Sequence, residues 1–240
     1  MRVTVTVDDL GMAEGIGESC RRLLDLGSVH RLSILTTGRF FEEASEIAWR
    51  SDAGISVHLN CVQPPFITDA DFPDSHTAWL TRGKKYAGQV EAEWRAQIEK
   101  ALNAGLTVTG LDSHQHLHNL PFLRKCMVDL ALEYGAGLIR VSVIPERWRS
   151  PVCFLLDAMG RRTAALARKR GIPTPDLMLG FSRSGRVSRK YLDGMESKLA
   201  KEGTAELVMH PSVEPVWSRH QPEEHRLLAS DWFGKWLKEH

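Results

Sequence analysis

Short runs of β-branched and apolar residues alternate with amphipathic stretches along the whole chain, and this alternation constrains the fold most strongly. The first run, Val3-Thr4-Val5-Thr6-Val7, is typical of a half-buried strand because β-branched side chains suit a pleated surface. Strands are predicted from Val3 to near Gly11 and then at 28–36, 54–62, 106–113, 137–142, 176–180 and 204–209. Helices are predicted at 13–26, 40–50, 89–104, 121–134, 150–171, 188–201 and 223–238.

Strands that alternate with helices pair in parallel through right-handed crossovers. The pattern therefore predicts an α/β fold, an irregular (β/α) barrel with about seven parallel strands, in preference to an open sheet. No linker or repeat divides the chain, so 1–240 is predicted to be a single domain. The segment 61–88, with Pro64, Pro65 and Pro73, interrupts the alternation and is predicted to be a long loop.

Polar residues gather where the predicted strands end. Asp8, Asp9, His58, Asp112, His114 and His210 all lie at or near a predicted strand C-terminus. Parallel α/β folds build their active sites at that edge, so we expect these side chains to converge.

One carboxylate and two imidazoles would form an open site for one divalent ion. Two adjacent carboxylates such as Asp8 and Asp9 repel each other, so a nearby cation is needed to keep both ionised. Asp9, His58 and His114 come from three different strands, as convergent ligands would.

The run Asp-Ser-His-Gln-His-Leu-His carries further candidates. If the strand continues through it, Asp112, His114, His116 and His118 lie on one face. One or two of them would bind the ion, and the others would support a ligand, contact substrate or serve as hydrogen-bonded packing residues.

Three further roles stay open in the sequence. Asp8 either acts as general base on a metal-activated water or only orients a ligand. His210, in Val-Met-His-Pro-Ser, is either the general acid for a leaving amine or a strand-end residue bonded to the backbone. Arg140, within the apolar Leu-Ile-Arg-Val, orients Asp8, contacts substrate or reaches solvent, since burying it alone is costly.

Composition limits the other classes of function. The formal charge of +1 gives no electrostatic reason to expect nucleic acid, and no apolar run has the length of a membrane span. Four dispersed cysteines and the absence of an apolar leader predict a cytoplasmic protein. The C-terminal Trp232, Phe233 and Trp236 would serve either the core or a homodimer interface.

The motifs together resemble the YdjC family of carbohydrate deacetylases, which includes chitooligosaccharide deacetylases. The resemblance rests on Asp-Asp-x-Gly at Asp8, Gly-x-x-x-His-Leu at Gly54, the histidine run that begins at Asp112, and His210-Pro211. It implies an irregular (β/α) barrel, a divalent metal on Asp9, His58 and His114, Asp8 as base and His210 as acid.

The same resemblance implies hydrolysis of an N-acetyl group from an acetylated amino sugar or chitooligosaccharide. Leu10, Gly17 and Ser212 stand where the family commonly has Phe, Asn and Gly, and these departures concern the substrate rather than the ligands.

Two other functions remain alternatives. One is another barrel metallohydrolase, acting on a phosphoester or cyclic amide, with Asp112 and His116 as ligands of a second metal. The other is a non-catalytic protein that binds sugar or metal. Zinc and magnesium are the first candidates for the ion, with manganese and cobalt after them.

Overall fold

Six parallel strands form one curled sheet in the part of the chain that the computed structural model describes, residues 1–199 and 202–240. The strand order is β4-β3-β2-β1-β6-β5, which places β1 at the centre. The strands are β1 (Arg2–Leu10), β2 (Arg31–Ile34), β3 (Gly54–Leu59), β4 (Val108–Ser113), β5 (Leu177–Leu179) and β6 (Thr204–Met209).

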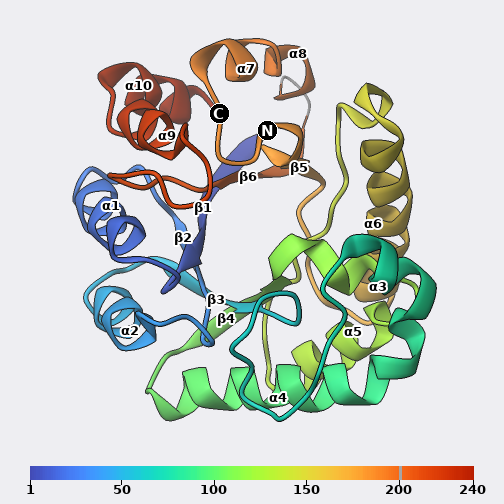
Figure 1. Cartoon of the computed structure of the whole chain (residues 1–240). Helices are drawn as coiled ribbons and strands as arrows, with labels where there is room; N and C mark the ends of the chain where they lie inside the picture. The colour runs from blue at the N-terminus through green and yellow to red at the C-terminus, as the bar shows by residue number, and fades with distance from the viewer. Residues whose placement is uncertain (200–201) are drawn as a thin grey trace.

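Helices surround the sheet on its outer side, as Figure 1 shows. The longer ones are α1 (Glu14–Asp25), α2 (Phe41–Trp49), α4 (Ala87–Asn103), α5 (Arg124–Glu133), α6 (Pro151–Lys169), α9 (Gln221–Leu228) and α10 (Asp231–Glu239). The short ones are α3 (His76–Arg82), α7 (Arg189–Asp193) and α8 (Glu196–Leu199), with 3₁₀ turns η1 (Gly83–Tyr86), η2 (His114–Asn119), η3 (Arg147–Arg149) and η4 (Phe181–Arg183).

Two predicted helices are each divided in the structure. The helix predicted at 188–201 is α7 and α8, which Gly194 separates, and its positions 200–201 lie outside the described residues. The helix predicted at 223–238 is α9 and α10, because Ser230 accepts a hydrogen bond from the Phe233 amide and starts a new helix there.

The strand predicted at 137–142 is not a regular strand. It makes a single bridge, Leu111 to Ile139, although its backbone lies between β4 and β5. Arg140 N–H donates to the Leu111 carbonyl over 3.1 Å, and Met178 N–H in β5 donates to the Val143 carbonyl over 2.8 Å. Pro173 lies beside this segment and has no N–H, so a full ladder cannot form on that side. The barrel is therefore closed by an irregular segment, as the fold prediction allowed.

The segment 61–88 is only partly a loop. Its second half forms α3 and η1, and its aromatic side chains pack beneath it. Phe72 contacts Phe66 with ring centroids 4.9 Å apart and Trp79 with centroids 5.9 Å apart. Phe72 and Trp79 are buried, so these rings stabilise the segment.

The two faces of β1 pack against different surroundings. Val3, Val5 and Val7 belong to the apolar core, and the alternate residues face a polar interior. There the Thr6 hydroxyl donates to Glu206 over 2.8 Å, in the neighbouring strand β6. Barrel interiors are usually filled by aliphatic side chains, so this polar interior indicates a functional requirement.

The C-terminal aromatics divide between two environments. Phe233 and Trp236 are buried in the main core, and Trp232 packs against it partly exposed. The buried rings of Phe233 and Trp236 are therefore not available for a homodimer interface. The homodimer itself stays a prediction. No helix among the described residues has the length and apolar character needed to cross a membrane.

Candidate metal centre

A distortion at the end of β1 brings two neighbouring carboxylates to one site. Asp9 has φ 63°, and the register with β2 shifts between Val7 and Leu10. Side chains of a regular strand alternate between faces, so this left-handed residue is what allows Asp8 and Asp9 to face the same cavity. Backbone strain of this kind in a residue other than glycine is concentrated at functional sites.

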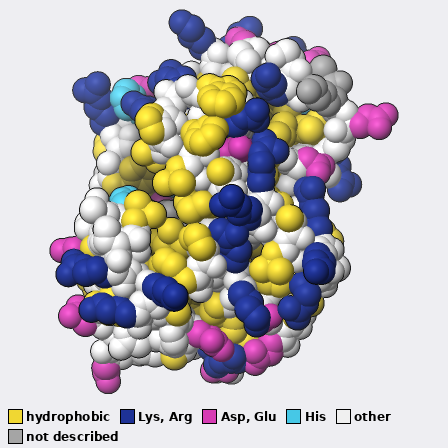
Figure 2. All heavy atoms as spheres, turned by 90° about the vertical axis from the view of Figure 1, so that its right-hand side faces the viewer, with side chains coloured by type: hydrophobic (Ala, Val, Ile, Leu, Met, Phe, Trp, Pro, Cys, Tyr) yellow, Lys and Arg dark blue, Asp and Glu magenta, His cyan; other side chains and the backbone are white. Residues whose placement is uncertain are grey.

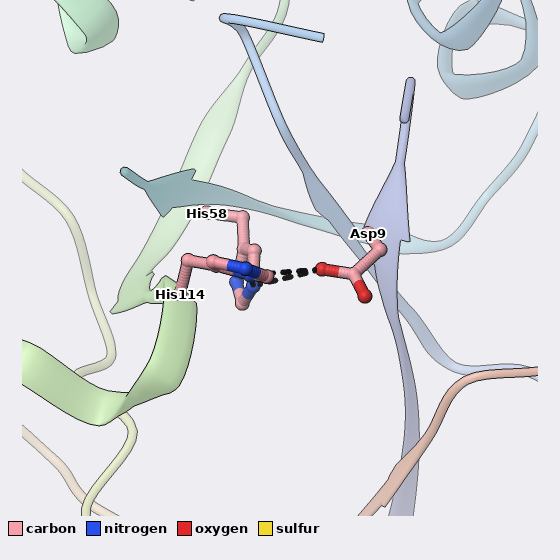
Figure 3. A group of neighbouring side chains, drawn as sticks. All are labelled: Asp9, His58 and His114. Atoms are coloured by element: carbon pink, nitrogen blue, oxygen red, sulfur yellow. Dashed lines mark hydrogen bonds and ion pairs between the residues drawn. The ribbon is translucent and has the colours of Figure 1, made fainter. Parts of the chain in front are cut away.

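Asp9, His58 and His114 converge on one point, as Figure 3 shows. They come from the ends of β1 and β3 and from the first residue of η2, directly after β4. Asp9 Oδ1 lies 3.3 Å from His58 Nε2 and 3.1 Å from His114 Nδ1, and the two nitrogens are 3.2 Å apart. The three predicted ligands thus form a nearly equilateral triangle.

This triangle fits a single metal ion. Two donor atoms that each lie about 2.1 Å from one ion are about 3.0 Å apart at a right angle and about 3.4 Å apart at the tetrahedral angle. All three measured separations fall between these values. Asp9 Oδ1 is buried without a hydrogen-bond partner, which a metal ion would correct.

His58 is held in the orientation that a ligand needs. Its Nδ1 hydrogen-bonds to Asp112 Oδ1, and Ser33 Oγ donates to the same oxygen over 2.7 Å. A carboxylate on the far nitrogen of a metal-binding histidine fixes the tautomer and makes the ligand more basic. Burial alone would lower the pKa of His58, but Asp8 and Asp112 raise it to about 10. The site therefore attracts positive charge, which a bound cation would supply instead of the proton.

The second oxygen of Asp9 has a partner from another part of the chain. The Trp217 indole N–H donates to Asp9 Oδ2 over 3.1 Å, which leaves Oδ1 for the ion. Burial would raise the pKa of Asp9, but His114 and His58 lower it well below its usual range. Asp9 is thus ionised and directed by its neighbours.

Arg140 binds Asp8 through two parallel hydrogen bonds. Its Nη1 donates to Asp8 Oδ2 over 2.6 Å and its Nη2 to Asp8 Oδ1 over 2.7 Å. Glu206 and Asp112 also lie beside the guanidinium, 3.0 Å and 3.4 Å away. Burial opposes its charge, but Asp112, Asp8 and Glu206 raise the pKa of Arg140 well above its usual value. Arg140 is 1% exposed and does not reach solvent.

The charges of the site do not balance without a further cation. Asp8, Asp9 and Asp112 face one fully buried guanidinium, that of Arg140, and without an ion a proton on His58 offsets a second of the three charges. An excess of buried negative charge is costly, and a divalent cation would offset it.

His210 lies beside Asp8 at the same end of the barrel. Its Nε2 is 3.9 Å from Asp8 Oδ2, and its ring meets the edge of Trp217 with centroids 5.1 Å apart. Its backbone N–H donates to the buried Glu224 over 2.6 Å. Burial lowers the pKa of His210, although Asp9 and Asp8 act in the opposite direction. Burial therefore favours the neutral form of this ring.

The predicted alignment of the histidine run is wrong. The strand ends at Ser113, and Gln115 and His116 have φ values of 53° and 58°, so alternate residues no longer share a face. Only His114 joins the ligand triangle. His116 lines the cavity, and burial lowers its pKa well below the usual value. His118 is buried between Ser113 and Asn119, and burial lowers its pKa to about 4.

A second metal ion has no suitable set of ligands among the described residues. The other group of close donors is Asp8, His58 and Asp112. Arg140 already binds Asp8, and His58 with Ser33 already occupies Asp112. His116 lies in neither group, so the geometry disfavours the predicted alternative of two metals.

Four contributors were missed from the sequence: Ser33, Glu206, Trp217 and Glu224. Glu206 had a signal, because a lone carboxylate inside Thr-Ala-Glu-Leu-Val-Met indicates a partner for the equally isolated Arg140. The other three have no distinctive sequence signal.

The ligand triangle opens into a cavity of about 650 Å³. Asp8, Asp9, His58, His114 and His210 lie at its polar end, and Trp217 also lines it. A concave site with perturbed titratable groups is the arrangement expected of an active site. Fold and side chains thus define a parallel (β/α) barrel with one candidate centre for a divalent metal at its strand ends.

The chain belongs to the YdjC-like family, whose "YdjC-like protein" model matches residues 2–239. It is 25% identical over 219 residues to a carbohydrate deacetylase of Geobacillus stearothermophilus, covering 87% of this chain and 78% of that protein. It is 26% identical over 253 residues to a carbohydrate deacetylase of Homo sapiens, covering 90% and 76%. These relatives confirm the predicted family and support a hydrolytic deacetylase.

Solved structures confirm the predicted fold. A crystal structure from Enterococcus faecalis, described as that of a cellobiose-phosphate cleavage protein, superposes with a TM-score of 0.79. It is 22% identical and the match covers 99% of this chain and 94% of the other. At this identity the likeness concerns the fold alone.

Proposed function

We propose that the chain is a metal-dependent carbohydrate deacetylase that hydrolyses the N-acetyl group of an acetylated amino sugar. The observation that carries the proposal is the triangle of Asp9, His58 and His114, with Asp8 and His210 beside it in one cavity. The relatives named carbohydrate deacetylase support the same reaction.

The ion, when bound, would polarise the amide carbonyl and lower the pKa of a water molecule. Zinc and magnesium fit the set of two imidazoles and one carboxylate, as do manganese and cobalt. A magnesium site usually keeps several waters and prefers oxygen ligands, so the two histidines favour zinc.

Asp8 is the proposed general base. Arg140 occupies one lone pair on each of its oxygens, and a carboxylate has further lone pairs that can accept a proton from water. Since Arg140 also fixes the plane of the carboxylate, the base needs little reorientation during the reaction. The water oxygen then bonds to the acetyl carbon.

His210 is the proposed general acid. Its Nε2 lies 3.9 Å from Asp8 Oδ2, so the proton that Asp8 accepts from the water would pass to this ring and from the ring to the amine nitrogen as the C–N bond breaks. The products are acetate and the free amino sugar. Trp217 and Glu224 hold the ring and the backbone of His210 in place.

Release of acetate tests the proposal. Diacetylchitobiose and a panel of N-acetyl sugars would be incubated with metal-stripped protein, and with the same protein after addition of Zn, Mn, Co or Mg. Release that requires a metal is expected. If the protein binds metal tightly and releases acetate from no member of the panel, the proposed function is wrong.

A further inference from the structure

The cavity changes character with distance from the ligand triangle. Carboxylate and imidazole side chains line its polar end, whereas α6 contributes only apolar side chains to its wall and α3 contributes Trp79 and Leu80 beside His76. The apolar side chains of α3 and α6 that line it are Trp79, Leu80, Val152, Leu155, Leu156 and Met159.

Helix α6 supplies the clearest part of this wall. Its four lining residues, Val152, Leu155, Leu156 and Met159, are spaced i, i+3, i+4 and i+7, which defines one apolar stripe of a helix. Such a stripe normally packs on a protein core, and Leu156 and Met159 do so in part. Val152 and Leu155, by contrast, are 65% and 46% exposed in the cavity wall.

The helix α3 contributes a second apolar wall to the same cavity. Leu80 lines the cavity while 54% exposed, and the neighbouring Trp79 lines it as a buried residue. Among these side chains the Trp79 indole N–H is the one donor and the Met159 sulfur a weak acceptor, and His76 at the start of α3 is the polar lining residue on this side. A sugar ring placed against the aliphatic side chains would lose hydration of its hydroxyl groups without compensation.

Apolar surface also continues beyond the cavity along the start of α6. Trp148 and Phe154 are 75% and 47% exposed and contact each other with ring centroids 5.2 Å apart. Figure 2 faces the side on which α3 and α6 lie in Figure 1 and shows hydrophobic side chains gathered there among Lys and Arg. An apolar group longer than the cavity would therefore remain in contact with apolar surface.

We infer that the substrate is amphipathic: an N-acylated amino sugar that carries a long aliphatic chain. The polar end of the cavity holds the amide and the sugar, and the stripe of α6 with Leu80 holds the chain. The reaction in this inference rests on the proposed function. Binding of an aliphatic chain to the apolar wall does not depend on that reaction. The chain is either the aglycone on the anomeric carbon or the acyl group that is removed.

Two series of substrates separate these sources. The first series is the methyl, hexyl and octyl glycosides of N-acetylglucosamine, and the second is glucosamine with N-acetyl, N-hexanoyl and N-octanoyl groups, all below their micellar concentrations. Release of free amine gives kcat/KM for each. A fully buried methylene group is worth about fourfold in affinity, so kcat/KM should rise at least tenfold along the series whose chain occupies the cavity.

A matched pair of variants tests the place of the chain. Leu155→Gln should reduce the octyl-to-methyl ratio of kcat/KM, or the corresponding N-acyl ratio, by at least fivefold. Leu132→Gln is the control, because Leu132 is similarly exposed, at 40%, on α5 and does not line the cavity. It should leave the ratio unchanged.

Other outcomes would overturn the inference. If methyl N-acetylglucosaminide is hydrolysed and kcat/KM is flat along both series, the apolar walls do not bind substrate. A dimer that Leu155→Gln dissociates, together with flat series, would assign this surface to a second copy of the chain.

Failure of the proposed function gives a different result. In that case no amine is released from any substrate, and octyl glucoside, which has no amide, is used as a binding probe with tryptophan fluorescence. Binding that Leu155→Gln weakens and Leu132→Gln does not would keep the apolar site, whereas no binding would refute it.

Discussion

Removing the guanidinium of Arg140 should cost a large part of the stability of the protein. In the structure this group is 1% exposed and lies between Asp8, Asp112 and Glu206, all of them buried. The substitution Arg140→Ala would leave these carboxylates close together in the barrel interior without their common partner. Breaking a buried ion pair by removing one side costs about 3–5 kcal/mol.

That cost is large against the whole stability of a domain, which is about 5–15 kcal/mol. Urea unfolding of metal-stripped protein, followed by circular dichroism, measures it without a contribution from metal binding. Arg168→Ala is the control, because Arg168 forms an ion pair with Asp176 in which both side chains are nearly half exposed. The control should lose no more than about 1 kcal/mol.

A second substitution separates charge from packing. In the Arg140→Ala background, Glu206→Gln removes one of the repelling carboxylates and should recover part of the lost stability. In the wild type the same Glu206→Gln change removes a partner of Arg140 and should not stabilise. If Arg140→Ala costs no more than Arg168→Ala, the charge argument for the barrel interior is wrong.

Three further predictions concern the site. His58→Ala and His114→Ala should each abolish tight metal binding, measured by metal analysis after dialysis. His225→Ala is the control, because His225 is a half-buried histidine on α9 that bonds to Ser19, and this variant should keep the metal. Equal loss of metal in all three variants would point to unfolding instead. Trp217→Phe keeps a ring beside His210 but removes the hydrogen-bond donor to Asp9 Oδ2. Metal affinity, measured by competition with a chelator, should therefore fall about tenfold. An unchanged affinity would show that this hydrogen bond does not support metal binding. Burial raises the pKa of Glu224 from its usual range to about 8. The folded state therefore keeps a proton on Glu224 that the unfolded state releases above about pH 4.5. The protein should accordingly lose stability as the pH rises toward 8. Urea unfolding from pH 5 to 8 should show a loss of up to a few kcal/mol in the wild type and a smaller loss in Glu224→Gln. A steeper loss of stability in the variant would contradict the proposed effect of the Glu224 proton.

Much of the fold was predictable because strands and helices differ in hydrophobic period. The β-branched run at Val3 and the alternation that follows predicted the parallel barrel, which the structure confirms. The irregular segment at 137–142 was less accessible, because its apolar composition is that of a strand and the lack of a full ladder on its β5 side depends on Pro173, in the segment before β5.

The clustering of the candidate ligands was predictable where strand ends coincide with metal-binding residue types. Asp9, His58 and His114 meet as that reasoning requires. The histidine run was misassigned because no pattern in the sequence signalled the left-handed conformation of Gln115 and His116. Trp217 and Glu224 act from loops and helices after β6, and only the folded chain brings them to Asp9 and His210.

The proposed function depends on different roles for the two adjacent aspartates, with Asp9 holding the metal and Asp8 acting as the base. It is tested most directly by measuring metal content and acetate release in the same preparations of Asp8→Asn and Asp9→Asn. Asp8→Asn should retain one metal ion per chain and lose turnover, whereas Asp9→Asn should lose the metal. Loss of metal from Asp8→Asn, with full occupancy in Asp9→Asn, would contradict it.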